Sequence, residues 1–535
     1  MRLNKIYILL CLISASLFYA GWPNNGIPIF LFLIFVPIFF LQKKINEDDK
    51  KNKNLRVWLY SYLVFLMWNL STTWWLINAS ISGMIIANLF NSLFFSFIFL
   101  LFQLGKKRLS LNSSYILFIS SWISFEKLHL YWSISWPWLN LGNGFSDYIY
   151  WIQWYEFTGT MGGTLWILIL NIGFFETFKN YRNSYTLLYF LKNSSKLIIG
   201  ITIPIIISLL IYVNHEDSDD KIKIVSVQPN IDPYNEKYRY SNPDLLKIFG
   251  DLIKKYHGKN IDYILLPETY FSSGYGERLR TFNLNALDKK IKLLLENIGE
   301  SQLISGIQFY DVYTDLDKTL TSNKVRKNMW IDYYNSAISV SPVAKTNFYH
   351  KSKLVVGVET LPYAKYLMPI IGKFMIDLGG TVSNRVTQKK RSVFKHPQKQ
   401  IISAPVICYE SIYGEFNTEY VRLGADFLSV ISNDAWWGNS PGHKQLLSYT
   451  RLRAIENRRA IARSANTGIS ALINERGEYL KKLDYGLKGS IYGEIPLVKK
   501  ITFYTKYGDL LGRISILIFL IYFFIAISGR FTPKI

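Results

Sequence analysis

The sequence is poor in the residues that build disulfides and metal centres. Its 535 residues include two cysteines, Cys11 and Cys408, and six histidines. Because Cys11 lies in the first apolar segment, the rest of the chain holds a single thiol and cannot form an internal disulfide. No cluster of histidine, cysteine and carboxylate residues has the spacing of a metal site, and no glycine-rich phosphate loop is present. We therefore expect neither a metal nor another cofactor.

Acidic residues are also scarce relative to basic ones. Lysine and arginine number 61 against 38 aspartate and glutamate residues, which gives a formal net charge of +23. Such an excess can indicate nucleic-acid binding. Much of it, however, lies in short loops between apolar segments, where membrane topology explains it. The remaining positive charge suits anionic lipid headgroups. The sequence therefore predicts a membrane bilayer as a partner and no nucleic acid.

Long apolar runs fill the first 213 residues and return near the C-terminus. A helix needs about 20 residues to cross the hydrocarbon core of a bilayer. If flanking Trp, Tyr and Asn residues lie in the interface, eight spans are predicted, at residues 6–20, 27–41, 57–77, 84–104, 115–125, 160–175, 197–213 and 514–528. Three asparagines within them, Asn88, Asn91 and Asn171, are predicted to make contacts between helices.

Clusters of basic residues orient these spans. They precede the first span, follow the second and the fourth, separate the sixth from the seventh and end the chain, so they fall on alternate loops. By the positive-inside rule both termini are then cytoplasmic. This topology predicts a transmembrane domain of seven spans over residues 1–213 and an extracytoplasmic domain over residues 214–510. Residues 511–535 would form the last span and a short cytoplasmic tail.

The part between residues 214 and 510 alternates strand-like and helix-like segments, which is typical of an α/β layered domain. The first helix is predicted to begin with Asn242 as its N-cap and Pro243 at its first position. Residues 364–375 suit a loop that covers a site or touches a membrane. Strands are predicted at 223–227, 263–267, 303–308, 336–340, 401–408, 427–432, 462–465 and 469–473, and helices at 242–256, 286–297, 415–422 and 442–459.

Three polar residues come at the end of strand-like runs or in the loop after one: Glu268, Lys351 and Cys408. A thiol at a strand end can be a nucleophile when a nearby base takes its proton. A carboxylate can be that base, and a lysine can stabilise an oxyanion and depress the pKa of the thiol. Taken singly, each residue also has a structural explanation, as a helix cap, a solvated loop charge or a thiol of the core.

The order Glu, Lys, Cys resembles the catalytic triad of the nitrilase superfamily. Residues 227–231 (VQPNI), 432–438 (SNDAWWG) and 463–468 (RSANTG) are similar to turns of its membrane-bound branch, the apolipoprotein N-acyltransferases. The resemblance covers most of the chain, including the membrane segments. It implies an α-β-β-α sandwich for residues 214–510, with Glu268 as the base, Cys408 as the nucleophile and Lys351 as the cation beside the oxyanion.

Supporting residues can be named around this triad. By resemblance, Glu359 positions the lysine or the base, although Val356-Gly357-Val358 stands where the family has Pro-Phe-Gly. The backbone N–H of Tyr409 would be a second oxyanion donor. Glu410 would orient the loop of the nucleophile, or else form a salt bridge with an arginine. Four aromatic residues are candidates for substrate binding: Trp436 and Trp437 as apolar walls, Tyr238 by its place in the family, and Trp138 in an interfacial aromatic patch.

The sequence therefore predicts a membrane-bound N-acyltransferase. The resemblance implies that a phospholipid donates an acyl chain to Cys408 as a thioester, and that the α-amino group of a diacylglyceryl-cysteine apolipoprotein accepts it. The enzyme would lie in the bacterial inner (cytoplasmic) membrane, with its catalytic domain on the periplasmic side. The alternatives are a membrane-tethered amidase or nitrilase, in which water resolves the thioester, and a non-catalytic membrane scaffold. A dyad of Cys408 and His443 is a further alternative.

Overall fold

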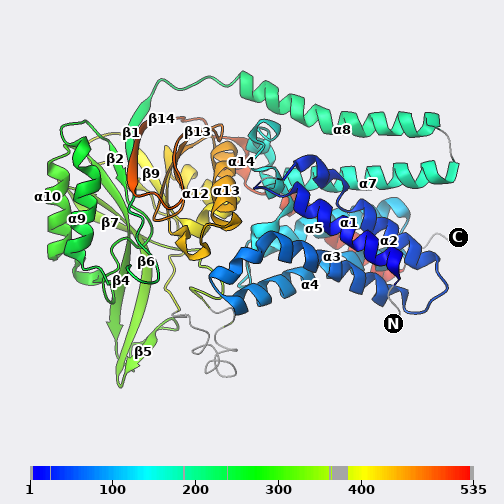
Figure 1. Ribbon diagram of the computed structural model, residues 1–535, viewed down its shortest axis with the longest axis horizontal. Helices are drawn as coiled ribbons and strands as arrows, with labels where there is room; N and C mark the ends of the chain where they lie inside the picture. The colour runs from blue at the N-terminus through cyan, green and yellow to red at the C-terminus, as the bar shows by residue number, and fades with distance from the viewer. Residues whose placement is uncertain are drawn as a thin grey trace. The chain divides into compact units, whose positions relative to one another are not determined.

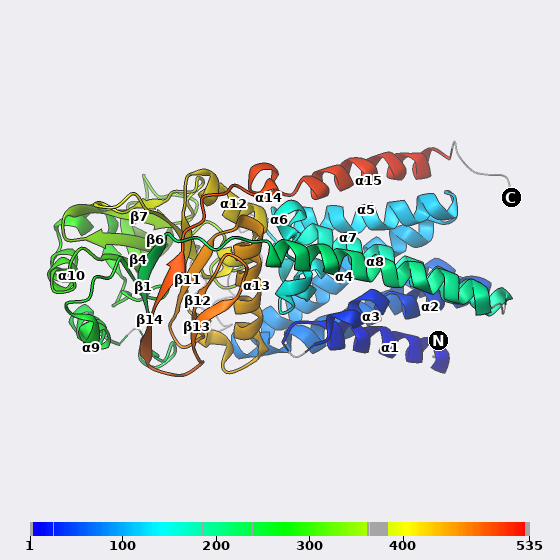
Figure 2. The same ribbon diagram turned by 90° about the horizontal axis from the view of Figure 1, so that it is seen from above.

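The structure is a computed structural model that describes residues 4–24, 26–184, 187–237, 239–360, 363 and 384–529. It divides into two compact units, a helical unit and a sheet unit. The helical unit takes in Met1–Ile77, Ile81–His215 and Tyr507–Ile535. The sheet unit takes in Asn78–Ser80 and Glu216–Lys506. Figures 1 and 2 show the elements of each unit from two directions. The loop predicted at residues 364–375 lies outside the described residues.

The helical unit is built from long helices joined by short helical turns. Within the part of the chain that the structure describes, five segments are long and apolar enough to cross a membrane: Pro28–Glu47, Ile81–Gly105, Thr160–Tyr181, Leu191–Val213 and Leu510–Ser528. The helices are α1 (Lys5–Gly21), α2 (Val36–Glu47), α3 (Lys53–Thr73), α4 (Ile81–Gly105), α5 (Leu111–His129), α6 (Tyr155–Thr158), α7 (Thr160–Ser184), α8 (Leu187–Val213) and α15 (Leu510–Ser528).

The predicted spans therefore differ in how strongly the structure supports them. The segments predicted at 27–41, 84–104, 160–175, 197–213 and 514–528 overlap the five long apolar segments. Residues 57–77 and 115–125 lie mainly in α3 and α5, which are helical but not among those five within the described part of the chain. The helix α1 is apolar but shorter. A membrane domain is thus confirmed, and the number of eight spans stays a prediction.

Asparagines join the helices of this unit, as predicted. Asn91 of α4 donates from Nδ2 to Oδ1 of Asn69 in α3 at 2.8 Å. Asn171 of α7 donates to the carbonyl of Leu31 at 2.8 Å and accepts from the N–H of Phe35 at 2.7 Å. Because lipid offers no competing hydrogen-bond partners, such pairs hold apolar helices in register.

The sheet unit contains two sheets that face each other. The first has the order β14-β1-β2-β4-β6-β5, with β3 paired to β4 and β7 paired to β6, and the second has the order β13-β12-β11-β10-β9-β8. The first consists of β1 (Lys221–Gln228), β2 (Tyr263–Leu265), β3 (Glu277–Arg278), β4 (Gln302–Tyr313), β5 (Asn323–Arg326), β6 (Met329–Ser341), β7 (Ala344–His350) and β14 (Gly489–Pro496). The second consists of β8 (Phe394–Lys395), β9 (Ile402–Ile407), β10 (Phe427–Ser432), β11 (Ala460–Ala465), β12 (Ser470–Ile473) and β13 (Tyr479–Leu483).

Helices cover the outer faces of both sheets. In Figure 1, α9 (Asn242–Ile253) and α10 (Ala286–Glu296) lie beside the first sheet, and α12 (Gly414–Arg422) and α13 (Pro441–Asn457) lie beside the second. Strands β1, β2, β4 and β6 contact strands of the second sheet. The predicted α-β-β-α sandwich is therefore confirmed. The central strands of each sheet are parallel: β1, β2 and β4 in the first sheet and β9, β10 and β11 in the second.

The helix α9 shows how the outer layer is fixed. Leu245, Phe249 and Ile253 are buried at a helical spacing and join the core between α9, α10 and the first sheet. The N-cap is Ser241, whose hydroxyl accepts from the N–H of Asp244 while the Asp244 carboxylate accepts from the N–H of Ser241. The prediction of Asn242 as N-cap was wrong by one residue, because serine followed three positions later by an acid forms a reciprocal capping box.

Candidate active site

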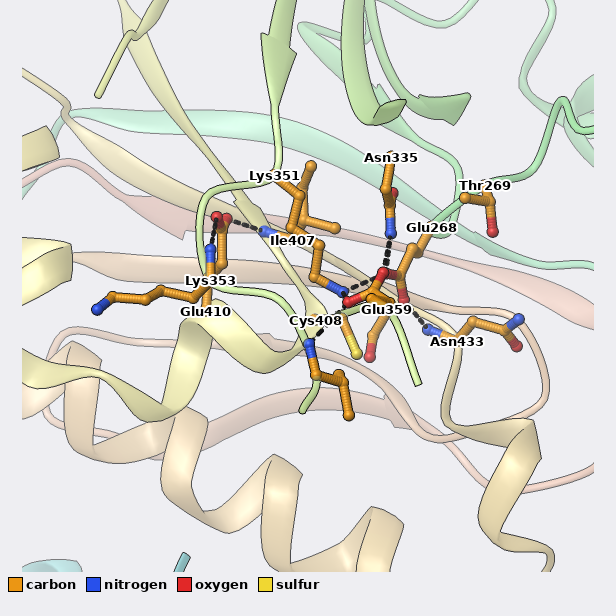
Figure 3. Close-up of polar contacts among 12 residues, drawn as sticks. Glu268, Thr269, Asn335, Lys351, Lys353, Glu359, Ile407, Cys408, Glu410 and Asn433 are labelled. Atoms are coloured by element: carbon orange, nitrogen blue, oxygen red, sulfur yellow. Dashed lines mark hydrogen bonds and ion pairs between the residues drawn. The ribbon is translucent and has the colours of Figure 1, made fainter. Parts of the chain in front are cut away.

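The three residues predicted as a triad meet at strand ends. Glu268 follows β2 and Lys351 directly follows β7, both in the first sheet, whereas Cys408 directly follows β9 in the second sheet. Figure 3 shows their side chains pointing toward one another between the two sheets. The carboxyl ends of parallel strands commonly form binding sites in α/β sheets. The sandwich thus brings a carboxylate, an amine and a thiol together from segments that are far apart in the sequence.

The Lys351 ammonium lies between two carboxylates. Its Nζ is 2.8 Å from Oε1 of Glu268 and 2.9 Å from Oε2 of Glu359. Only 1 % of the Lys351 surface is exposed. Burial alone would lower the pKa of Lys351, but the two carboxylates outweigh it and hold that pKa above its ordinary value. Lys351 is therefore a fixed cation at neutral pH.

Asn335 completes this arrangement. Its Nδ2 donates to Oε1 of Glu268 and to Oε1 of Glu359, at 2.8 Å in each case. The residue lies in β6, and its carbonyl accepts from the N–H of Lys351 at 2.8 Å, which continues the pairing of β6 with β7. We did not predict Asn335 from the sequence. The sequence places Asn335 immediately before the predicted strand at 336–340 but does not indicate that it contacts the triad.

Glu359 is tied to the same cluster, as the resemblance implied. Its Oε2 accepts from the N–H of Val355 at 2.9 Å in addition to its contact with Lys351. Burial alone would raise the pKa of Glu359, but Lys351 and Arg385 outweigh it and hold that pKa below its ordinary value. Glu359 is therefore an anion that restrains the lysine together with Glu268.

The Glu268 carboxylate is also held by the second sheet. Its Oε2 accepts from the N–H of Asn433 at 3.1 Å, in the turn that follows β10. The next residue, Thr269, has a φ of 47°, and a Cβ built on Gly306 would lie 2.2 Å from the Thr269 nitrogen. Gly306 is thus required for the close approach of β4 to the Glu268 turn. These constraints fix the carboxylate between the lysine and the Asn433 backbone.

Cys408 occupies a strained turn. Its φ is 51°, a left-handed backbone conformation that residues other than glycine rarely adopt. Such conformations are found at functional sites. Ser411 donates from its hydroxyl to the Cys408 carbonyl at 2.7 Å. Burial raises the pKa of the Cys408 thiol, Glu268 adds to the rise, and Lys351 opposes it. Lys351 does lower the pKa of the thiol, as expected of a nearby lysine, but burial and the Glu268 carboxylate outweigh it. The resting thiol is neutral.

Glu410 connects the turn of Cys408 to the loop of Lys351. Its Oε2 accepts from the N–H of Ile407 at 2.8 Å. Its Oε1 accepts from the N–H of Ser352 at 2.6 Å and from the hydroxyl of Tyr349 at 2.7 Å. Burial raises the pKa of Glu410, and the two N–H donors oppose that rise. These contacts agree with a positioning role rather than with a surface salt bridge, and Figure 3 shows the carboxylate between the two loops.

The other residues that were predicted to belong to the site are two tyrosines and three tryptophans. Tyr409 is buried against Tyr413, with ring centroids 5.4 Å apart. Trp436 and Trp437 are half-buried, and Trp138 is buried in the helical unit, stacked on Trp136. Tyr238 is outside the described residues. The oxyanion role of the Tyr409 N–H and the substrate-binding roles of the four aromatic residues stay predictions.

The structure gives His443 different partners from those of a Cys-His dyad. Its ring is 4.5 Å from that of Tyr485, and its Nε2 is 3.3 Å from Oδ1 of Asn439. Burial lowers the pKa of His443 to about 4, so its ring is neutral at physiological pH. Over the described residues, no group of three or more His, Cys, Asp or Glu side chains could hold a metal ion.

Two known protein families match parts of this chain. Residues 223–501, about half of the chain, match the carbon-nitrogen hydrolase family. The chain belongs to this family. Residues 14–173 match a second family, described as the apolipoprotein N-acyltransferase N-terminal domain. The two matches together place the protein in the membrane-bound branch that its sequence resembles, and they identify an acyltransferase-type enzyme with a membrane domain.

Two of the relatives match this chain over nearly its whole length. The apolipoprotein N-acyltransferase of Chlorobaculum tepidum is 25 % identical over 93 % of this chain and 92 % of its own length. That of Geobacter metallireducens is 24 % identical over 94 % of this chain and 91 % of its own length. That of Wigglesworthia glossinidia brevipalpis is 32 % identical over 58 % of each chain. The likeness therefore extends over the helical unit as well as the sheet unit.

Proposed function

We propose that the protein transfers an acyl chain from a phospholipid to the N-terminal α-amino group of diacylated apolipoproteins. The observation that carries the proposal is the cluster in which Lys351 lies between Glu268 and Glu359 beside the Cys408 thiol. This cluster contains a base, a nucleophile and an oxyanion donor, which are the three groups that acyl transfer needs. The long apolar helices and the named relatives support lipid-anchored substrates.

The first half-reaction forms an acyl-enzyme. The Cys408 thiol gives its proton to the Glu268 carboxylate as its sulfur attacks the ester carbonyl of the phospholipid. Because the resting thiol is neutral, proton transfer must accompany the attack. Lys351 stabilises the oxyanion, and the N–H of Tyr409 is the proposed second donor. The C–O bond then breaks, Glu268 returns the proton to the departing oxygen, and lysophospholipid leaves.

The second half-reaction transfers the acyl chain to nitrogen. The α-amino group of the diacylglyceryl-cysteine attacks the thioester carbonyl, and Glu268 takes a proton from that nitrogen. When the C–S bond breaks, the Cys408 sulfur receives the proton and the neutral thiol is restored. Water is the competing nucleophile, since it would give a free fatty acid instead of an amide. Trp436, Trp437, Tyr238 and Trp138 are proposed to line the path of the lipid chains.

The membrane setting completes the proposal. A site close to the bilayer raises the effective concentration of two lipid-anchored substrates. We propose that the sheet unit lies on the periplasmic side of the bacterial inner membrane and that both termini are cytoplasmic, as the alternating basic loops indicate. No nucleic acid and no cofactor takes part.

The test is the intact mass of the detergent-purified protein after incubation with phospholipid and no acceptor. We expect an increase of one acyl chain that hydroxylamine removes. Cys408→Ala should show no increase, whereas Cys11→Ala, which changes the chain's other cysteine in α1, should acylate normally. A synthetic diacylated lipopeptide should then discharge the thioester and become triacylated.

Two outcomes would contradict the proposal. Discharge by water, with free fatty acid and no triacylated peptide, would indicate a hydrolase. No adduct on the unchanged protein, together with a lipopeptide that stays diacylated in the complete reaction, would remove the acyltransferase assignment. Accumulation of the adduct on Cys11→Ala but not on Cys408→Ala would assign the nucleophile.

A further inference from the structure

A cavity of about 210 Å³ lies at one end of the helical unit. Its lining comes from the start of α1, the start of α3 and the loop that joins α2 to α3. Figures 1 and 2 show α1 and α3 side by side. The cavity shares no residue with the candidate active site, so the chemistry proposed above does not account for it.

A hydrogen-bonded ion pair forms one wall of the cavity. Arg56 of α3 donates from Nη1 to Oδ1 of Asp48 at 2.7 Å, and the hydroxyl of Tyr7 in α1 donates to Oδ2 of the same carboxylate at 2.9 Å. The rings of Tyr7 and Tyr60 meet edge to face, with their centroids 5.5 Å apart. Because these contacts tie α1, α3 and the intervening loop to one another, the cavity is built into the fold.

The lining of the cavity is positively charged. Lys50, Lys51 and Arg56 contribute three positive charges, and the adjoining acids Asp48 and Asp49 contribute two negative ones, which leaves one net positive charge. Asp48 is taken up by Arg56, and Asp49 is exposed and outside the lining. Within the described part of the chain, the ammonium groups of Lys50 and Lys51 form no ion pair. Both are therefore available to an anion.

The neighbouring charges do not reverse this sign. Glu47 is paired with Lys43, with Oε1 and Nζ 3.7 Å apart. Lys53 donates from Nζ to the carbonyl of Asn46 at 2.8 Å and adds a further positive charge near the cavity. Asn52, the N-cap of α3, makes no side-chain hydrogen bond to that helix, so its first N–H groups add partial positive charge beside the lysines.

Apolar side chains line the same cavity. Leu55 and Leu59 lie one turn apart on α3 and are 49 % and 40 % exposed. Exposed apolar residues next to charged ones are typical of a surface that meets lipid. The segment Pro28–Glu47, which is long and apolar enough to cross a membrane, ends directly before the loop of Lys50. The cavity therefore lies where a helix leaves the hydrocarbon, at the depth of the lipid headgroups.

We propose that this cavity binds the phosphate headgroup of an anionic phospholipid. Lys50, Lys51 and the start of α3 hold the phosphate, while Leu55 and Leu59 lie along the first part of an acyl chain. Basic pockets between membrane helices bind anionic headgroups in this way. A free phosphate would use the cations and leave both leucines uncovered. The proposal does not rest on the proposed function, because lipid binding here requires no acyl transfer.

The experiment is a titration of the detergent-purified protein, followed by native mass spectrometry, with phosphatidylglycerol or phosphatidylcholine of identical acyl chains. All proteins carry Cys408→Ala, so that no acyl chain is transferred during the titration. We expect the parent to bind one phosphatidylglycerol more tightly than phosphatidylcholine. The double variant Lys50→Gln, Lys51→Gln should bind phosphatidylglycerol about 10- to 30-fold more weakly, as expected for two lysines at a membrane surface. Any lipid at the donor site is common to both proteins.

Three variants act as controls. The double variant Lys192→Gln, Lys196→Gln removes the same charge from exposed lysines of α8 and should bind as the parent does. The double variant Lys50→Arg, Lys51→Arg keeps the charge and should also bind normally. Leu59→Trp keeps both lysines but fills part of the cavity, so it should weaken binding of phosphatidylglycerol.

Four results would overturn the proposal. Equal binding of the two lipids by the parent would remove the preference for an anion. Equal losses in the two glutamine double variants would indicate a general attraction of anionic lipid to basic residues. Normal binding by a folded Leu59→Trp variant would show that the lipid does not enter the cavity. Displacement of the lipid by an equal concentration of glycerophosphoglycerol, which is the headgroup without acyl chains, would assign a free phosphate ester as the ligand.

Discussion

Glu410 offers the sharpest test of how the site is assembled. Its two carboxylate oxygens join the turn of the nucleophile, through the N–H of Ile407, to the loop of the lysine, through the N–H of Ser352 and the hydroxyl of Tyr349. Glu410→Gln keeps the shape of the side chain and replaces one oxygen by an NH2 group. Whichever way the amide lies, at least one buried N–H then faces another donor.

The size of the effect follows from these contacts. A hydrogen bond to a charged group contributes about 1.5–3 kcal/mol, and a buried polar group without a partner costs about 1–3 kcal/mol. We therefore expect a loss of about 3 kcal/mol in the free energy of unfolding. If most of this loss also applies to the transition state, the rate of acyl-enzyme formation should fall about 100-fold, since about 1.4 kcal/mol corresponds to a factor of ten.

Acyl-enzyme formation by intact mass and thermal unfolding are the two assays. Tyr349→Phe is the graded control, because it removes one of the four donors to Glu410 and leaves the N–H contacts of Ile407, Ser352 and Lys353 in place. It should slow the reaction by about tenfold or less, as expected for one hydrogen bond. Our account of the site would be refuted if Glu410→Gln reacted within threefold of the parent, or if Tyr349→Phe were the slower of the two.

Two further predictions concern the carboxylates around Lys351. Gly306→Ala would place a Cβ 2.2 Å from the Thr269 nitrogen and 2.5 Å from the Cα of Glu268. We therefore expect a destabilisation of about 1–3 kcal/mol and an acyl-enzyme formation that is slower by at least about tenfold. Unchanged kinetics would show that the Glu268 turn tolerates displacement. The pKa of Glu359 is lowered in the folded state, so the unfolded state binds this proton more readily. The stability that Glu359 contributes is therefore present above about pH 4.3 and is lost as the pH falls through the pKa of the folded state. The difference in unfolding free energy between the parent and Glu359→Gln should therefore shrink on acidification below about pH 4.3, and a constant difference between pH 7 and pH 3 would contradict this.

Two of the residues that meet in the site, Glu268 and Cys408, could be predicted because each one follows a recognisable strand. Glu268 and Cys408 follow short buried apolar runs, and the resemblance supplied Lys351 and Glu359 at positions where loop geometry is not readable from periodicity. The contacts of Asn335 and of the Asn433 backbone could not be predicted in the same way. They depend on the register of β6 with β7 and on the separation of the two sheets, which involve residues far apart in sequence.

The helical unit shows a different limit of sequence reasoning. Helices α3 and α5 were predicted as spans from the apolar runs at 57–77 and 115–125, yet they carry more polar residues than the five strongly apolar segments. In the structure such residues are partly accounted for by contacts with neighbouring helices, for example between Thr73 and Asn88 at 3.0 Å. Hydropathy measures each segment as if lipid surrounded it, so it undervalues helices whose polar side chains are satisfied by other helices.

The direction of the thiol pKa changes the meaning of the lysine in this site. Had Lys351 served to make a thiolate, the resting protein would hold a reactive anion that oxidants attack readily. Burial and Glu268 instead keep the Cys408 thiol neutral, and both carboxylates already engage the Lys351 ammonium. When the proton of Cys408 moves onto Glu268, the ion pair between Glu268 and the Lys351 Nζ weakens. The charge of the lysine is then available to the oxyanion that forms. Reactivity would then arise only when a carbonyl group lies beside the sulfur, which is how a free cysteine can remain intact until its substrate binds.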